Sequence, residues 1–225
     1  MSVSVVQTAT ATPFGTALTA GNTVFIIASL WASGDNTFTT SAPTLGGSGV
    51  TGTDLQQVTS PFVGGSTKVY QAIWMLPDVT GGQTSFGLTT SGGNANGIFA
   101  VEVAGLGASP ALDQHVSNSG SADSVASGTT SSTLHANEFV LGAAAIYSGS
   151  GGAPSGGWTT WKPASQAWGG YQIAAAKGAT FSWAQTASAP QGWAAGIITV
   201  AGSSPGGGAA SAASAVPALI AAGVI

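Results

Sequence analysis

The sequence predicts an all-β protein, an antiparallel β-sandwich of the jelly-roll kind with about ten strands. Three observations predict it. Runs rich in β-branched and aromatic residues recur along the chain, turn residues separate them roughly every ten residues, and no window has sustained helical periodicity with caps. Hydrophobic residues make up 44% of the 225 residues, which is enough for one sizeable core.

The expected strands are apolar or alternating segments bounded by Gly, Pro, Asn, Asp or Ser. In chain order they are 3–10, 23–30, 55–58, 68–76, 84–89, 97–104, 138–147, 171–176, 179–184 and 193–201. The nearly continuous apolar run 23–30 is typical of a strand buried on both faces. In 97–104, Phe99, Val101 and Val103 share one face. The Gly-, Ser-, Thr- and Pro-rich segment 40–52 predicts a long loop with one short strand.

Turn residues mark the boundaries between these strands. Gly21-Asn22 precedes the second strand, and Pro77 ends the strand 68–76. Gly81-Gly82 predicts a tight turn, because glycine takes positive φ without steric cost. Lys177-Gly178 and 190–192 separate the last three strands.

The composition of the chain changes near residue 202, from strand-forming residues to Gly, Ser, Pro and Ala. We expect residues 1–201 to form the β-sandwich domain and residues 202–225 to form a Gly/Ala/Ser linker with an apolar arm. The arm is predicted to dock onto a neighbouring subunit, and a disordered end is the alternative. The side chains expected to make that contact are Val216, Leu219, Ile220, Val224 and Ile225.

Charge excludes one class of partner. Only 4% of residues are charged, and the cations are three lysines with no arginine, so no patch exists to neutralise nucleic-acid phosphates. The chain has no cysteine for disulfides or thiolate metal sites. No basic segment precedes an apolar one at the N-terminus, so we expect no signal peptide. No apolar run is long enough for membrane insertion.

The residues do not suggest catalysis. Serines abound, but the only histidines are His115 and His135, and no nucleophile elbow is present. Among the carboxylates only Glu102 and Glu138 lie in strong strands, where a hydrogen-bonded structural role competes with a catalytic acid. Asp113 and Asp123 lack the spacing of a calcium loop. We therefore predict no enzyme, no cofactor and no metal site.

Tryptophan is the one residue type with functional promise. Trp158, Trp161 and Trp168 fall in a Gly/Pro-rich segment that predicts a loop. Rings placed there have three possible roles: a stacking platform for a sugar, anchors in a protein interface, or a cap on the open end of the sandwich.

The order of several segments resembles a β-sandwich module of bacterial and phage proteins. The segments include Leu18–Ala28, Val69–Trp74, Ala100–Leu106 and Ala136–Ala143, and they span nearly the whole chain before the arm. Similar modules occur in actinobacterial surface proteins and in minor tail or accessory virion proteins of actinophages. The resemblance implies a fold but transfers no catalytic or binding residues.

Two functions follow as hypotheses. The first is a structural protein of a tailed-phage virion, a minor tail or capsid-decoration subunit made in the host cytoplasm and bound to itself and to other virion proteins. The second is a carbohydrate-binding or adhesion module that recognises a bacterial envelope glycan through its tryptophans.

Overall fold

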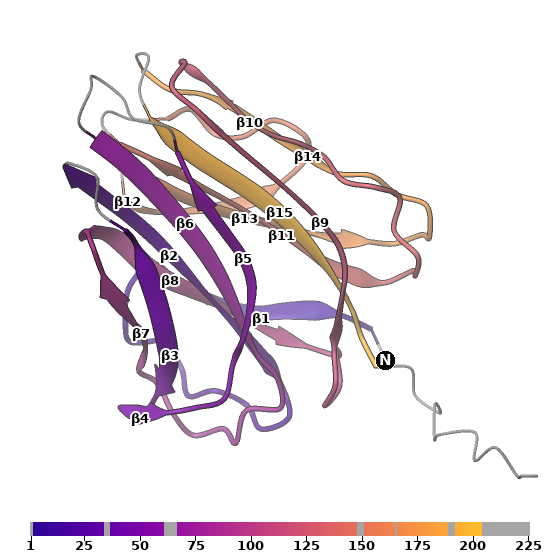
Figure 1. Ribbon diagram of the computed structural model, residues 1–225. Coiled ribbons are helices and arrows are strands. Elements are labelled where there is room, and N and C mark those ends of the chain that lie inside the picture. Colours follow the sequence, from indigo (N-terminus) through magenta and orange to yellow (C-terminus); the bar gives the residue numbers. More distant parts are fainter. Residues whose placement is uncertain are drawn as a thin grey trace, which may run out of the picture.

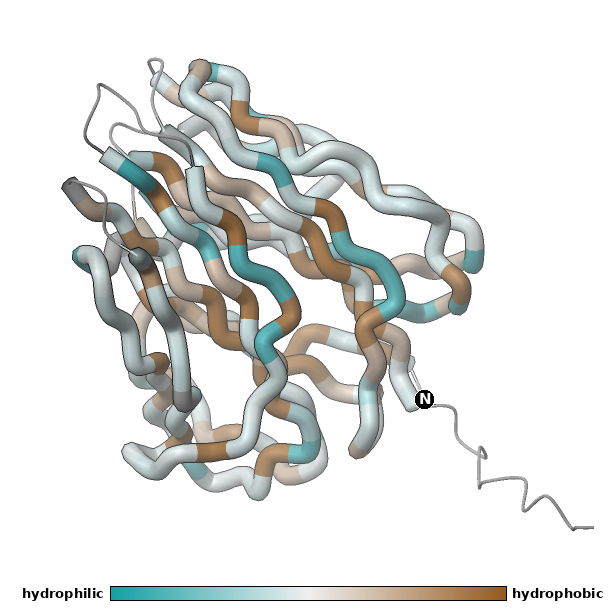
Figure 2. The backbone as a smooth tube through the Cα atoms, viewed as in Figure 1, coloured by the Kyte–Doolittle hydropathy of each residue, from teal (hydrophilic) through white to brown (hydrophobic). Residues whose placement is uncertain are grey.

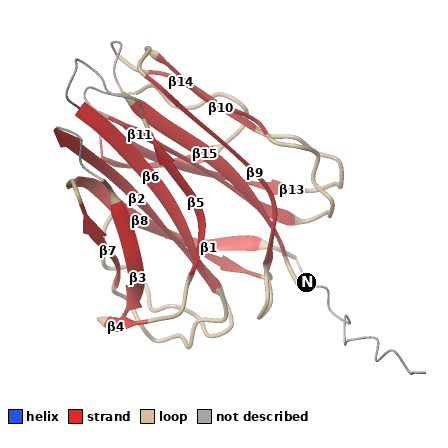
Figure 3. Cartoon of the chain, viewed as in Figure 1, coloured by secondary structure: helices blue, strands red, loops and turns tan. Residues whose placement is uncertain are grey.

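The computed structural model describes residues 2–33, 37–60, 67–147, 151–164, 166–188 and 192–203, and it confirms the antiparallel β-sandwich (Figure 3). The described residues form fifteen strands and no helix. The strands are β1 (Ser4–Ala9), β2 (Thr23–Ser33), β3 (Thr39–Leu45), β4 (Ser48–Gly49), β5 (Thr53–Thr59), β6 (Thr67–Leu76), β7 (Phe86–Ser91), β8 (Asn94–Ala104), β9 (Ala111–Gly120), β10 (Ser124–Thr129), β11 (Glu138–Ile146), β12 (Thr159–Ala164), β13 (Ala167–Ala174), β14 (Ser182–Thr186) and β15 (Trp193–Ala201).

The strands form four sheets. The first large sheet has the order β1-β8-β2-β6-β5, and the first small sheet has the order β4-β3-β7. The second large sheet has the order β12-β13-β11-β15-β9, and the second small sheet pairs β10 with β14. Figure 1 shows these sheets as successive layers, with the two large sheets in the middle and one small sheet outside each.

Three hydrophobic clusters fill the spaces between the layers. Alternation along β2 sends Val24 and Ile26 towards the first small sheet, and it sends Phe25 and Ile27 into the central cluster between the large sheets. In β11, Leu141 enters the same central cluster, whereas its even-numbered neighbours face the second small sheet. Both faces of the central strands are therefore buried, which explains their continuous apolar runs (Figure 2).

The two large sheets have the same strand order and the same order of strands along the chain. β1, β8, β2, β6 and β5 of the first half correspond to β9, β15, β11, β13 and β12 of the second, and β7 corresponds to β14. The small sheets differ otherwise, because β3 follows β2 along the chain whereas β10 precedes β11. The registers can be aligned along a row, although β2 against β8 has a slip between Ser29 and Leu30 that β11 against β15 lacks. One row across each large sheet reads Thr8–Val101–Phe25–Met75–Thr53 and, in the other, His115–Ile198–Leu141–Tyr171–Thr159.

A β-bulge marks the same position in both halves. The register of β1 against β8 slips between Val5 and Gln7, which leaves Val6 as the extra residue. In β9 the slip opposite Thr199 and Val200 leaves Asp113 as the extra residue. The two large sheets are thus equivalent in strand order and in the position of this bulge, and they pack face to face.

Several strands differ from the sequence-based expectation. No strand was expected at β9, β10 or β12, and the segment of β3 and β4 was expected to be a long loop with one short strand. β13 begins at Ala167 rather than at residue 171. β9 and β12 are edge strands, and β10 belongs to a two-stranded sheet, so few of their side chains are buried and no apolar run marks them. Fifteen strands rather than about ten result.

Candidate functional site

The three tryptophans singled out from the sequence are buried. Trp158, Trp161 and Trp168 are only 9%, 8% and 8% exposed. Trp161 lies in β12 and packs in the central cluster, whereas Trp158 and Trp168 pack between the second large sheet and the second small sheet. The expected loop position is therefore wrong for Trp161 and Trp168. Rings this deeply buried offer no face for stacking on a sugar, and their packing matches the role of filling and capping the sandwich.

Glycines inside the strands make room for these rings. A Cβ on Gly169 would lie 2.6 Å from Cε2 of Trp161, and one on Gly142 would lie 2.5 Å from Cε3 of Trp183. In the same way the ring of Trp193 covers Gly120. Glycine normally weakens a strand, but here its missing side chain lets a large ring lie directly on the sheet.

Glu102 is buried, and its carboxylate ties together three segments of the first half. Its Oε1 accepts hydrogen bonds from the Thr19 backbone N–H at 2.8 Å and from Asn22 Nδ2 at 2.7 Å, and its Oε2 accepts one from Gln7 Nε2 at 2.7 Å. Each oxygen of this buried carboxylate therefore has at least one hydrogen-bond donor. The side chain fixes the turn before β2, which fits the structural role weighed for it.

Glu138 holds the corresponding turn of the second half. It is fully buried, and its Oε1 accepts a hydrogen bond from the His135 backbone N–H at 2.8 Å. Its Oε2 is buried without a hydrogen-bond donor. Burial raises the pKa of Glu138. Hydrogen bonding by the Thr199 hydroxyl and the His135 amide acts in the opposite direction, the neighbouring Asp113 raises the pKa as well, and the net direction is upward.

The remaining polar candidates do not converge. His115 and His135 are both exposed, and no hydrogen bond joins either imidazole to a serine hydroxyl in the described ranges. Asp35 lies outside the described residues. In the part of the chain that the structure describes, no three His, Cys, Asp or Glu side chains are placed to hold a metal ion together.

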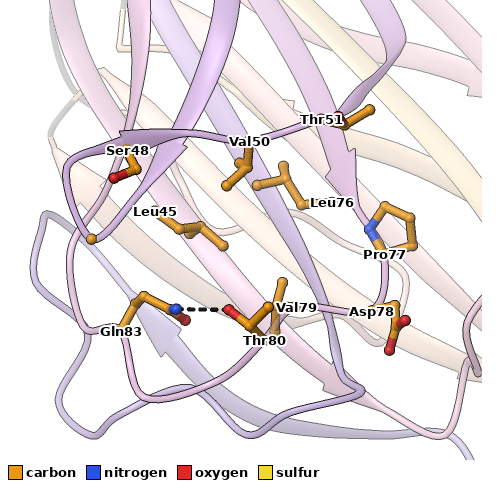
Figure 4. A pocket seen from close by; sticks show the side chains of 11 residues that line it. Leu45, Ser48, Val50, Thr51, Leu76, Pro77, Asp78, Val79, Thr80 and Gln83 are labelled. Atoms are coloured by element: carbon orange, nitrogen blue, oxygen red, sulfur yellow. Dashed lines mark hydrogen bonds between the residues drawn. The ribbon is translucent and has the colours of Figure 1, made fainter.

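A pocket of about 450 Å³ opens where the β3–β4 hairpin meets the chain that follows β6 (Figure 4). Leu45, Val50, Leu76 and Val79 gather at its centre, and Gln83 lies at its edge. Gln83 Nε2 donates to Thr80 Oγ1 at 2.8 Å, while Gln83 Oε1 is buried without a donor. The volume is that of a small-ligand pocket.

Nothing in the sequence predicts this pocket. Its lining comes from residues 45–51 and 76–83, separate segments that meet only because β3 packs over the end of β6. No motif marks either segment. The five side chains of the predicted arm, from Val216 to Ile225, lie outside the described residues.

Comparison of the chain with family models, with curated proteins and with solved structures finds no match. Among the described residues, no helix is long and apolar enough to span a membrane.

Proposed function

We propose that the protein is a non-enzymatic structural subunit of a tailed-phage virion, of the minor tail or accessory decoration type, and that it acts through protein–protein contacts. The observation that carries the proposal is the near absence of charge: three lysines and seven acidic residues serve a 225-residue chain. Two of the acidic residues, Glu102 and Glu138, are buried where they fix turns. A surface of hydroxyls and amides has weak charge repulsion, and it suits a protein that works inside an assembly.

The edges of the large sheets support contact through faces, loops and the arm. Each of the four edge strands β1, β5, β9 and β12 has a register irregularity against its neighbour. Bulged edges disfavour uncontrolled strand-to-strand addition, which natural proteins otherwise block with charged side chains. Because this chain has few charged side chains, the interrupted hydrogen-bond ladders at the edges protect it from strand addition instead.

Glycan recognition is the alternative, and the buried tryptophans weigh against the site first considered for it. If the protein binds a glycan, the pocket between Leu45 and Gln83 is the remaining candidate, because it combines an apolar centre with hydroxyl and amide groups at its rim. Binding of cell-wall glycans that is lost in Gln83→Ala and kept in Trp161→Phe would favour this alternative.

Light scattering on a sizing column tests the assembly role. We expect the full-length protein to form a defined oligomer, and we expect a version ending at Gly206 to be a monomer that unfolds at the same urea concentration. The described core ends at Ser203, so the cut removes no residue of the three clusters. Equal masses for the two proteins would contradict the role of the arm.

A further inference from the structure

Two carboxylates meet at the turn that leads into β11. Asp113 Oδ2 accepts a hydrogen bond from the Leu134 backbone N–H at 2.8 Å, and Glu138 Oε1 accepts one from the next amide, that of His135, also at 2.8 Å. Consecutive amides thus draw the two acids together. The second oxygen of Glu138 is buried and has no donor, although a buried carboxylate oxygen needs one.

The first half of the chain shows what is missing. Leu18–Asn22 leads into β2 as Leu134–Glu138 leads into β11, and the fourth residue of each turn has positive φ, 83° at Gly21 and 58° at Asn137. In the first turn, side-chain amides of Gln7 and Asn22 donate to the buried carboxylate of Glu102. In the second turn the bulge residue is Asp113, an acid, where the first half has Val6.

We propose that Glu138 and Asp113 share one proton, and that this proton is a pH-sensitive latch on the turn before β11. The proton resides on Glu138, whose hydroxyl donates to the Asp113 carboxylate and so supplies the donor that Oε2 lacks. Asp113 Oδ2 then still accepts from the backbone amide of Leu134, and Glu138 Oε1 still accepts from that of His135.

Charged neighbours do not offer another solution. The titratable side chains on the surrounding segments are Asp113 and His115 on β9, His135 in the turn itself, and Lys177 in the turn after β13, while β15 has none. Of these, only Asp113 acts on the charge of Glu138, and it raises the pKa of Glu138 in addition to the effect of burial. The uncharged Thr199 hydroxyl on β15 lowers that pKa, but it leaves Oε2 without a hydrogen-bond partner and the net direction upward. Two ionised carboxylates without a cation repel each other.

The sign of the pH effect follows. The folded pKa of Glu138 lies above its ordinary value of 4.5, so the folded protein holds a proton that the unfolded chain releases. The stability from this proton is fully present below the ordinary value and is lost as pH rises through the raised value. Opening the latch frees the loop that presents Leu134, a side chain 56% exposed, whereas its counterpart Leu18 is 3% exposed.

Urea unfolding of the full chain at a series of pH values between about 4.5 and about 8 tests the latch. In Glu138→Gln the amide still accepts from His135 and donates to Asp113 at every pH. We therefore expect the urea midpoint of this variant to exceed that of the wild type by a margin that grows with pH. Glu102→Gln is the matched control: its midpoint should be lower than the wild type at every pH, with no growing margin.

Amide hydrogen exchange in the wild type keeps the test valid if a variant fails to fold. Protection at Leu134 and His135 should fall as pH rises, while protection at Thr19, held by Glu102, should persist. A constant margin between Glu138→Gln and the wild type, or equal protection at all three amides, overturns the proposal. So does restoration of the high-pH midpoint by millimolar calcium, because a cation rather than a proton would then join the two acids.

Discussion

Replacing Gly169 with alanine tests whether glycine is required beneath a buried ring. The new Cβ would lie 2.6 Å from Cε2 and Cζ2 of Trp161 and 3.0 Å from Cε2 of Phe99. Both rings are buried in the central cluster, so neither can move into solvent. Overpacking of this kind costs about 2–3 kcal/mol, and the lower chain entropy of alanine returns about 0.5–1 kcal/mol. We expect a net loss of about 2 kcal/mol.

Thermal and urea unfolding measure this loss. For a domain of this size, about 2 kcal/mol corresponds to a Tm lower by about 4–8 °C. Gly15→Ala is the control, because a Cβ there meets nothing within 4 Å, and its Tm should stay near that of the wild type. In a Trp161→Phe background the cost of Gly169→Ala should shrink, since the two sites interact. A Gly169→Ala protein as stable as the control would refute the packing argument.

Three further outcomes are expected. Glu102→Ala leaves the donors of Thr19, Asn22 and Gln7 without their acceptor, and it should cost about 3 kcal/mol in urea unfolding; a loss below about 0.5 kcal/mol would contradict its structural role. Gly196→Ala displaces the Gln56 amide and breaks its 3.0 Å bond to the backbone carbonyl of Val116, so a smaller loss of about 1 kcal/mol is expected; no loss would mean that this link between the large sheets is dispensable. The two halves, expressed separately, should aggregate or associate, because each exposes one side of the central cluster; a soluble monomeric half would contradict the packing of the large sheets.

The sequence predicted the central strands well and the edge strands poorly. The central strands are buried on both faces or nearly so, and their sequences are therefore almost continuously apolar; these strands are β2, β6, β8, β11 and β15. β9 is an edge strand of mostly polar residues, so its sequence does not distinguish it from a loop. Burial, rather than strand formation itself, produces the pattern that can be read from a sequence.

The equivalence of the two large sheets left almost no signal in the sequence. Equivalent positions such as Phe25 and Leu141, or Met75 and Tyr171, differ in residue type, and their separation along the chain changes from strand to strand with loop length. The equivalence appears only in the registers and in the bulges at Val6 and Asp113. Pairing between distant strands fixes these features, and local sequence does not specify it.

For Trp161 and Trp168 the sequence predicted a loop where the structure has strands. Glycines around Trp158, Trp161 and Trp168 predicted a loop, and with it a possible ligand platform. Gly169, in β13 beneath the Trp161 ring, is a strand residue that provides space for that ring. Glycine content therefore reports close packing as well as turns, and only the position of the rings separates the two meanings.

The most direct test of the structural role is whether the protein is part of a particle. Gradient-purified phage particles from lysates that contain the chain should yield its peptides by mass spectrometry at a fixed ratio to the other structural proteins. Gold-labelled antibody against the β-sandwich should mark one constant position on those particles in electron micrographs. Detection of the protein only in the soluble fraction, with unlabelled particles, would contradict the proposed function.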